Sequence, residues 1–135
     1  MKPRDTKEQR VLVVEDEAVI GRVCRKVLAD HGFIVDVVPD GQKAVDRLQK
    51  QCYYDVCILD LRMPGVDGFQ LYKYLADNHR RLSRSVVFMT GDFTNSHVSK
   101  FLNDSERVCL PKPFTPQELL AAVKNATKKQ TLKGS

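Results

Sequence analysis

Five polar residues in this chain have side chains suited to chemistry, and each lies at the end of a run of apolar residues or shortly after it. Glu15, Asp16 and Asp60 are carboxylates, Thr90 offers a hydroxyl and Lys112 an ammonium. Three carboxylates brought together repel one another unless some are protonated or a cation joins them. Mg²⁺ suits such a site, because it binds one or two carboxylates and also accepts phosphate oxygens. An aspartate so placed can act as a nucleophile and form an aspartyl-phosphate, whose oxygens the hydroxyl and ammonium could contact.

Five short apolar runs define the elements that must position these residues. Most of the runs are continuous rather than alternating, which is typical of strands covered on both faces, as in parallel sheets. Helical patterns separate them, and right-handed crossovers would place helices on both faces of the sheet. The sequence therefore predicts a three-layer α/β fold, (βα)5, with a doubly wound parallel sheet of five strands. The runs are VLVV (11–14), FIVDVV (33–38), VCIL (56–59), VVFM (86–89) and VCL (108–110).

Apolar spacing also predicts five helices between and after the strands. The first helix has a five-residue apolar face and Gly32 as its stop signal. The second and third are predicted around residues 44–48 and 69–75, and the fourth over about 95–103. The fifth begins at residues 115–118, Thr-Pro-Gln-Glu, which form a capping box with proline at the first helical position. The apolar face of the first helix consists of Val19, Ile20, Val23, Val27 and Leu28.

The topology predicts that the five polar residues meet at one site. All strands of a parallel sheet end at the same edge, where ligands of open α/β sheets bind. Asp60 ends a core strand, which gives a nucleophile a rigid base and an open edge. Pro64 and Gly65 follow and turn the chain away from it. We expect Glu15 and Asp16 to cap the following helix as well as to bind the metal.

Composition limits the classes of function. The 135 residues fit one soluble domain, predicted over residues 10–128, with a polar tail at 1–9 and a basic tail at 129–135. The net charge of +5 comes from the two ends, and residues 11–123 have a net charge of −1. We therefore expect no direct nucleic-acid binding. Neither a membrane span nor a signal peptide is predicted, so the expected location is the cytoplasm.

The four cysteines do not form a recognisable metal site. Cys24, Cys52, Cys57 and Cys109 contain no CxxC pair, and the histidines are not spaced with them as zinc ligands. Cys57 and Cys109 lie inside strand candidates and are predicted to be reduced core residues.

Four motifs together resemble the response-regulator receiver family of two-component signalling. They are VLVVEDE, ILDLRMPGVDG, VVFMTG and LPKPF, in the family's order and spacing, and the resemblance covers about residues 10–128. It implies the flavodoxin-like strand order 2-1-3-4-5. By resemblance, Asp60 is the phosphoacceptor, Asp16 a direct metal ligand and Glu15 a partner acting through water.

The resemblance assigns roles to four further positions. The backbone carbonyl of Arg62 would be the third protein ligand of the metal, with Asp60 itself among the ligands. Thr90 would be the switch hydroxyl, and Gly91 the small residue that leaves room for the phosphoryl group. Lys112 would bind the phosphate, and its bond to Pro113 would be cis.

The implied function is a phosphoacceptor domain rather than a conventional enzyme. It would take a phosphoryl group from a sensor histidine kinase or a histidine phosphotransfer domain onto Asp60, with Mg²⁺ or alternatively Mn²⁺, and signal by changing conformation. Phosphotransfer and dephosphorylation would be self-catalysed, and homodimerisation on activation is compatible with the family. The chain is either a free-standing receiver or a piece of a longer protein such as a hybrid sensor kinase.

Two other functions would each need a feature that this sequence lacks. An aspartate-nucleophile phosphatase would need a second carboxylate where Arg62 stands, and a flavin or nucleotide carrier would need a glycine-rich loop after the first strand. A receiver-like module that binds partners without phosphorylation remains the alternative. One departure from the family is Cys109, which occupies a position that commonly carries Tyr or Phe. Cys109 is too small to fill the space that an aromatic ring fills there on activation.

Overall fold

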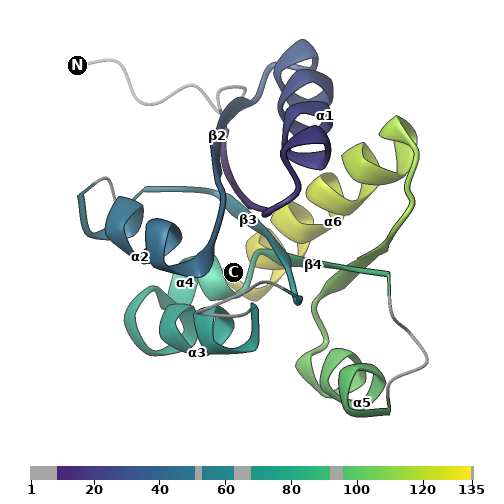
Figure 1. Ribbon diagram of the computed structural model, residues 1–135. Coiled ribbons are helices and arrows are strands. Elements are labelled where there is room, and N and C mark those ends of the chain that lie inside the picture. The colour runs from purple at the N-terminus through teal and green to yellow at the C-terminus, as the bar shows by residue number, and fades with distance from the viewer. Residues whose placement is uncertain (1–8, 51–52, 63–67, 92–95, 135) are drawn as a thin grey trace.

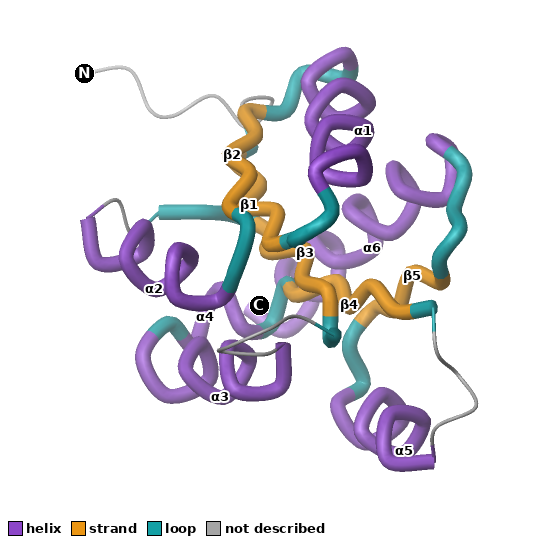
Figure 2. The backbone as a smooth tube through the Cα atoms, in the orientation of Figure 1, coloured by secondary structure: helices purple, strands orange, loops and turns teal. Residues whose placement is uncertain are grey.

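The strands form one parallel sheet in the order β2-β1-β3-β4-β5 (Figures 1 and 2). The computed structural model describes residues 9–50, 53–62, 68–91 and 96–134, with side chains described up to residue 128. The predicted fold class and strand order are confirmed. The strands are β1 (Arg10–Val14), β2 (Ile34–Val38), β3 (Val56–Asp60), β4 (Val86–Thr90) and β5 (Val108–Pro111).

The helices follow the predicted pattern with one addition, the single-turn helix α4 in the connection from α3 to β4. A four-residue helix is too short to leave a periodic apolar signal. The predicted fourth helix corresponds to α5, and α6 continues through residues 129–134, where the prediction was a basic tail. The helices are α1 (Ala18–Asp30), α2 (Gly41–Lys50), α3 (Gly68–Asn78), α4 (Arg80–Ser83), α5 (Ser96–Ser105) and α6 (Pro116–Gly134).

The helices lie on both faces of the sheet, so the chain has three layers (Figure 1). Alternate strand residues point to opposite faces. On one face, Val13 and Ile58 pack with α1 and α6, whose contributions include Cys24 and Leu119. The other face is covered by α2, α3 and α5, which contribute Ala44, Leu48, Leu71, Leu75 and Val98.

Burial of the strands follows their place in the sheet. The central strands β3 and β4 are buried along their whole length, and β1 is buried from its second residue on. The edge strands β2 and β5 are only partly buried, with Ile34 38% exposed. The prediction of two-sided cover thus applies to the three central strands, because an edge strand lacks a neighbour on one side.

The buried face of α1 differs from the predicted one. Gly21, Cys24 and Leu28 are buried, whereas Val19 is 63% and Val23 43% exposed. Gly21 is the contact point, since a Cβ there would lie 2.9 Å from Val37 Cγ1. Because α1 packs on β2 through Gly21, the side of the helix that carries the two valines faces solvent.

Three smaller predictions can be compared with the structure. The capping box of α6 is confirmed: the Glu118 amide donates to Thr115 Oγ1 at 3.1 Å and the Thr115 amide to Glu118 Oε1 at 2.8 Å. Cys57 is a free, buried thiol as predicted, while Cys109, also free, is only half-buried. The turn at Pro64-Gly65, the tail at residues 1–8 and Cys52 lie outside the described residues. In the part of the chain that the structure describes, no helix is both long and apolar enough to cross a bilayer.

Candidate functional site

Asp60 is the last residue of β3 and is held rigidly at the strand-end edge of the sheet. Its side chain is 4% exposed. One carboxylate oxygen, Oδ1, accepts a hydrogen bond of 2.9 Å from the Arg62 amide, and Oδ2 accepts one of 2.7 Å from Lys112 Nζ. The first turn of α3 packs directly on its backbone, where a Cβ on Gly68 would lie 2.6 Å from the Asp60 carbonyl oxygen. The nucleophile candidate therefore has a fixed backbone and an oriented carboxylate.

Three consecutive acidic residues after β1 face Asp60. Glu15 is buried, Asp16 and Glu17 are exposed, and ligand atoms of these three residues and of Asp60 all lie within 4.8 Å of one another. Glu17 was not among the predicted site residues. Its amide donates to Glu15 Oε2 at 3.1 Å, and it occupies the N-cap position of α1 without a side-chain capping bond. Of the two residues expected to cap α1, Glu15 thus accepts a hydrogen bond from the N-cap amide, whereas the N-cap position itself belongs to Glu17.

Lys112, after β5, is the cation that this acidic cluster contacts. Its Nζ lies 2.7 Å from Asp60 Oδ2, 2.7 Å from Glu15 Oε1 and 3.6 Å from Glu17 Oε1. Burial alone would lower the pKa of Lys112, but its hydrogen bonds and the charges of Asp60 and Glu15 outweigh burial and raise that pKa. The ammonium is therefore charged at every physiological pH and bridges the two buried carboxylates.

Glu15 is the carboxylate whose charge is most costly. Burial raises the pKa of Glu15 to about 7; its contact with Lys112 opposes the rise and the charge of Asp60 adds to it. Oε1 of Glu15 forms an ion pair with Lys112 Nζ at 2.7 Å. Four carboxylates facing one ammonium leave an excess of negative charge. The all-oxygen donor set and the excess charge fit a hard divalent cation such as Mg²⁺.

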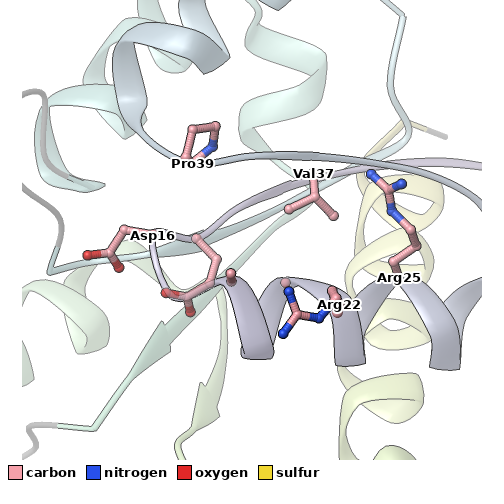
Figure 3. A pocket seen from close by; sticks show the side chains of 8 residues that line it. Asp16, Arg22, Arg25, Val37 and Pro39 are labelled. Atoms are coloured by element: carbon pink, nitrogen blue, oxygen red, sulfur yellow. The ribbon is translucent and has the colours of Figure 1, made fainter.

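The site is open to solvent at the edge of the sheet. A hollow of about 420 Å³ is lined by Asp16, Glu17, Asp60, Arg62, Gly91 and Lys112. A second groove, of about 480 Å³, begins at Glu15 and Asp16 and continues between α1 and the end of β2 (Figure 3). Asp16 lies near Pro39 at one end of this groove, and Arg22 and Arg25 extend from α1 along it (Figure 3). A phosphoryl donor can therefore reach Asp60 from outside.

Comparison with known proteins identifies the family. The family model of the response regulator receiver domain matches residues 11–124. The chain belongs to this family. It is 35% identical over 81% of its length to transcription factor SKN7 of Saccharomyces cerevisiae, and 35% identical over 86% to transcriptional activator protein IrlR of Burkholderia pseudomallei. It spans only 17% and 49% of those two proteins. The solved chemotaxis response regulator CheY4 of Vibrio cholerae matches with a TM-score of 0.78 at 27% identity, covering 88% of this chain and 98% of that one.

The structure brings the remaining predicted residues of this receiver domain to the same edge. Thr90, at the end of β4, is fully buried, and its carbonyl oxygen accepts a hydrogen bond of 3.0 Å from the Lys112 amide. Gly91 lines the hollow, and a Cβ there would come no closer than 3.8 Å to Lys112. The cis bond between Lys112 and Pro113 is observed as the resemblance implied. The structure thus brings Asp16, Asp60 and Lys112 to the rim of one hollow, while Glu15 and Thr90 are buried at the same edge of the sheet.

Cys109 leaves the aromatic position of this receiver domain without a ring, but aromatic side chains gather close by. Phe101 on α5 lies 5.2 Å from the ring centre of Phe88 on β4 and 4.7 Å from that of Phe69 on α3. Tyr72 completes the cluster at 5.1 Å from Phe88. The inner face of α5 is therefore attached to the sheet through Phe101, beside β5 where Cys109 lies opposite Phe88.

Proposed function

We propose that Asp60 of this receiver domain accepts a phosphoryl group from a phosphohistidine of a sensor histidine kinase or a histidine phosphotransfer domain. The observation that supports the proposal most directly is the placement of Asp60, a buried carboxylate with its amide and ammonium contacts, at the rim of a hollow open to solvent. An oriented carboxylate at an accessible edge has the geometry of a nucleophile.

The transfer would be a simple displacement at phosphorus. An Asp60 oxygen attacks phosphorus, an O–P bond forms and the N–P bond of phosphohistidine breaks, and its electron pair returns to the imidazole. Lys112 Nζ, which contacts Asp60 Oδ2 before the reaction, would remain beside the new group and contact a phosphoryl oxygen. The buried Thr90, at the neighbouring strand end, would donate its hydroxyl to another.

Mg²⁺, with Mn²⁺ as an alternative, would be held by Asp16, Asp60 and the backbone carbonyl of Arg62, with Glu15 acting through water. When bound, the cation would neutralise the charge that the phosphoryl oxygens add to four carboxylates. Glu17 belongs to the same cluster and would add a further negative charge beside the cation. The chain's own ammonium, Lys112, cannot balance that charge alone.

The partner would dock beside the acidic cluster and act on this domain in the cytoplasm. Val19 and Val23 are large apolar side chains that stand exposed on α1, three and seven residues after Asp16. Exposed apolar side chains around a polar site are typical of protein–protein contacts. A Val19→Ser, Val23→Ser variant should be phosphorylated normally by a small phosphodonor and more slowly by a phosphorylated histidine phosphotransfer protein.

Phosphotransfer from such a protein, measured with and without a chelator, tests the proposal. Transfer that requires Mg²⁺ and Asp60 supports it. The affinity for the partner distinguishes the proposal from the alternative, a module that binds partners regardless of phosphorylation. If the partner binds the apo and beryllofluoride-loaded forms equally tightly, the alternative is favoured.

A further inference from the structure

A third cavity lies at the opposite edge of the sheet from Asp60. It has a volume of about 410 Å³ and is lined by Tyr53, Tyr54, His79, Arg80, Arg81 and Leu82. Tyr53 and Tyr54 precede β3, and residues 79–82 connect α3 to β4, so the whole length of β3 separates this cavity from the phosphoacceptor. Small-molecule sites in proteins have volumes of about 300–1,000 Å³. The cavity is therefore large enough for a ligand and independent of the site described above.

One wall of the cavity is held in place by a buried carboxylate. Asp55 is 2% exposed and accepts hydrogen bonds from the Arg10 amide at 2.8 Å and from the Tyr53 hydroxyl at 3.1 Å. It also pairs with Arg81 at 3.6 Å, and the Arg81 guanidinium lies 5.0 Å from the centre of the Tyr53 ring. Asp55 thus fixes an aromatic ring and a guanidinium against each other. Such a stack offers flat surfaces to a planar ligand at little cost in side-chain entropy.

Part of the positive charge at this cavity is not paired with any carboxylate of the described residues. Residues 79–84, HRRLSR, contain three arginines and no acid. Asp55 offsets Arg81, but the exposed Arg80 pairs with no carboxylate among the described residues, and neither does Arg84, which follows the cavity. A purely structural role is the simpler explanation of the contacts among Asp55, Tyr53 and Arg81. That explanation does not account for the cavity, nor for Arg80, which pairs with no carboxylate among the described residues.

We propose that this cavity binds a planar ring carrying a phosphomonoester, the chemistry of a nucleoside monophosphate. The ring would stack on the flat surfaces of Tyr53 and Arg81. The phosphate, with a charge of about −1.5 to −2 at neutral pH, would contact Arg80 and the exposed edge of Arg81, because guanidinium forks match phosphate oxygens. A dianion matches these two arginines better than a single carboxylate does.

Titration with adenosine monophosphate, followed by backbone NMR and calorimetry, tests the proposal. Resonances of residues 53–54 and 79–82 should shift in a saturable way, while those of Thr90 and Lys112 stay in place. The exposed Arg80→Gln should weaken binding at least about tenfold. Tyr53→Leu should weaken it too, and Tyr53→Phe, which keeps the ring, should bind better than Tyr53→Leu. The matched control is Arg25→Gln, which removes an exposed arginine from α1 and should bind as the wild type does.

Inorganic phosphate, adenosine and an acidic peptide separate the competing explanations. Weak binding of phosphate and of adenosine, each alone, supports a site for the joined pair. Equal affinity for phosphate and the nucleotide would overturn the role of the ring, and tighter binding of the peptide would identify a protein-binding surface instead. No saturable shift at residues 79–82, or equal loss in Arg25→Gln and Arg80→Gln, would overturn the proposal.

Discussion

Lys112 Nζ lies 2.7 Å from Asp60 Oδ2, so the proposed phosphoacceptor is already paired with the lysine proposed to bind its phosphate. The same ammonium contacts Glu15, and its side chain is only 15% exposed. Lys112→Met would leave two buried carboxylates without their cation. We expect the free energy of unfolding to fall by about 3 kcal/mol in the absence of metal, and Mg²⁺ to restore part of it.

Denaturant unfolding with and without Mg²⁺ measures both effects. Lys124→Met, which removes an exposed lysine from α6, is the control and should change stability by less than about 0.5 kcal/mol. If the two variants were equally stable, the lysine would not be compensating the acidic cluster.

Asp16 is the exposed member of the cluster predicted to bind the metal directly. Asp16→Asn should weaken Mg²⁺ binding at least about tenfold and slow phosphorylation. The apo fold should remain as stable, because the change removes a like charge from beside Glu15 and Asp60. Titration calorimetry checks this, with Asp77→Asn on α3 as the control. Unchanged Mg²⁺ affinity in Asp16→Asn would show that another acid, such as Glu17, holds the metal.

Tyr54 gives a pH-dependent contribution to stability that is separate from the site. It is 2% exposed and donates a hydrogen bond of 2.7 Å to Asp36 on β2. Burial raises the pKa of Tyr54 to about 12, and the hydrogen bond to Asp36 adds to the rise. The folded state therefore holds the proton more tightly than the unfolded chain, whose tyrosine titrates near 10. The stabilisation is complete below pH 10 and is lost as the pH rises towards 12.

Comparing wild type with Tyr54→Phe isolates this contribution. The wild type should lose about 2–3 kcal/mol more than the variant between pH 9 and pH 12. Denaturant unfolding across that range measures the difference. Parallel stability curves for the two proteins would mean that Tyr54 does not hold its proton more tightly in the folded state.

Thr90 and Cys109 should contribute unequally to the response to phosphorylation. Thr90 is at the end of the strand next to Asp60, so its hydroxyl can follow the phosphoryl group, whereas Cys109 is too small to replace an aromatic ring. The response should instead reach α5, whose Phe101 packs on Phe88 of the strand that ends in Thr90. Thr90→Ala should abolish the beryllofluoride-induced NMR shifts of α5 without preventing phosphorylation, and Cys109→Ala should leave them largely intact. Loss of the shifts in Cys109→Ala would show that the cysteine has taken the aromatic's role.

The location of the site was predictable because Asp60 and Thr90 end their strands and Glu15 and Lys112 directly follow theirs. The apolar runs predict a parallel sheet whose strands all end at one edge, which brings Glu15, Asp60, Thr90 and Lys112 together, and the strand order followed from the family resemblance. The pairing of Lys112 with two carboxylates was not predictable, since the path of a long flexible side chain is set by contacts rather than by spacing. Glu17 was missed for the same reason.

Other features depend on packing that sequence periodicity does not encode. Val19 and Val23 fit the apolar stripe of α1, but the close approach of Gly21 to Val37 turned them to solvent. Helix α4 has a single turn and therefore no periodic signal. The stack of Arg81 on Tyr53 joins residues of two separate connections, and only the folded chain shows that they meet.

The most direct test of the central claim is the intact mass of the protein after incubation with a small phosphodonor and Mg²⁺. Wild type should gain the mass of one phosphoryl group, and the gain should disappear when the metal is chelated. Asp60→Asn, which keeps the shape of the side chain but removes the nucleophilic carboxylate, should gain nothing. Equal labelling of Asp60→Asn and wild type would contradict the assignment of Asp60 as the phosphoacceptor.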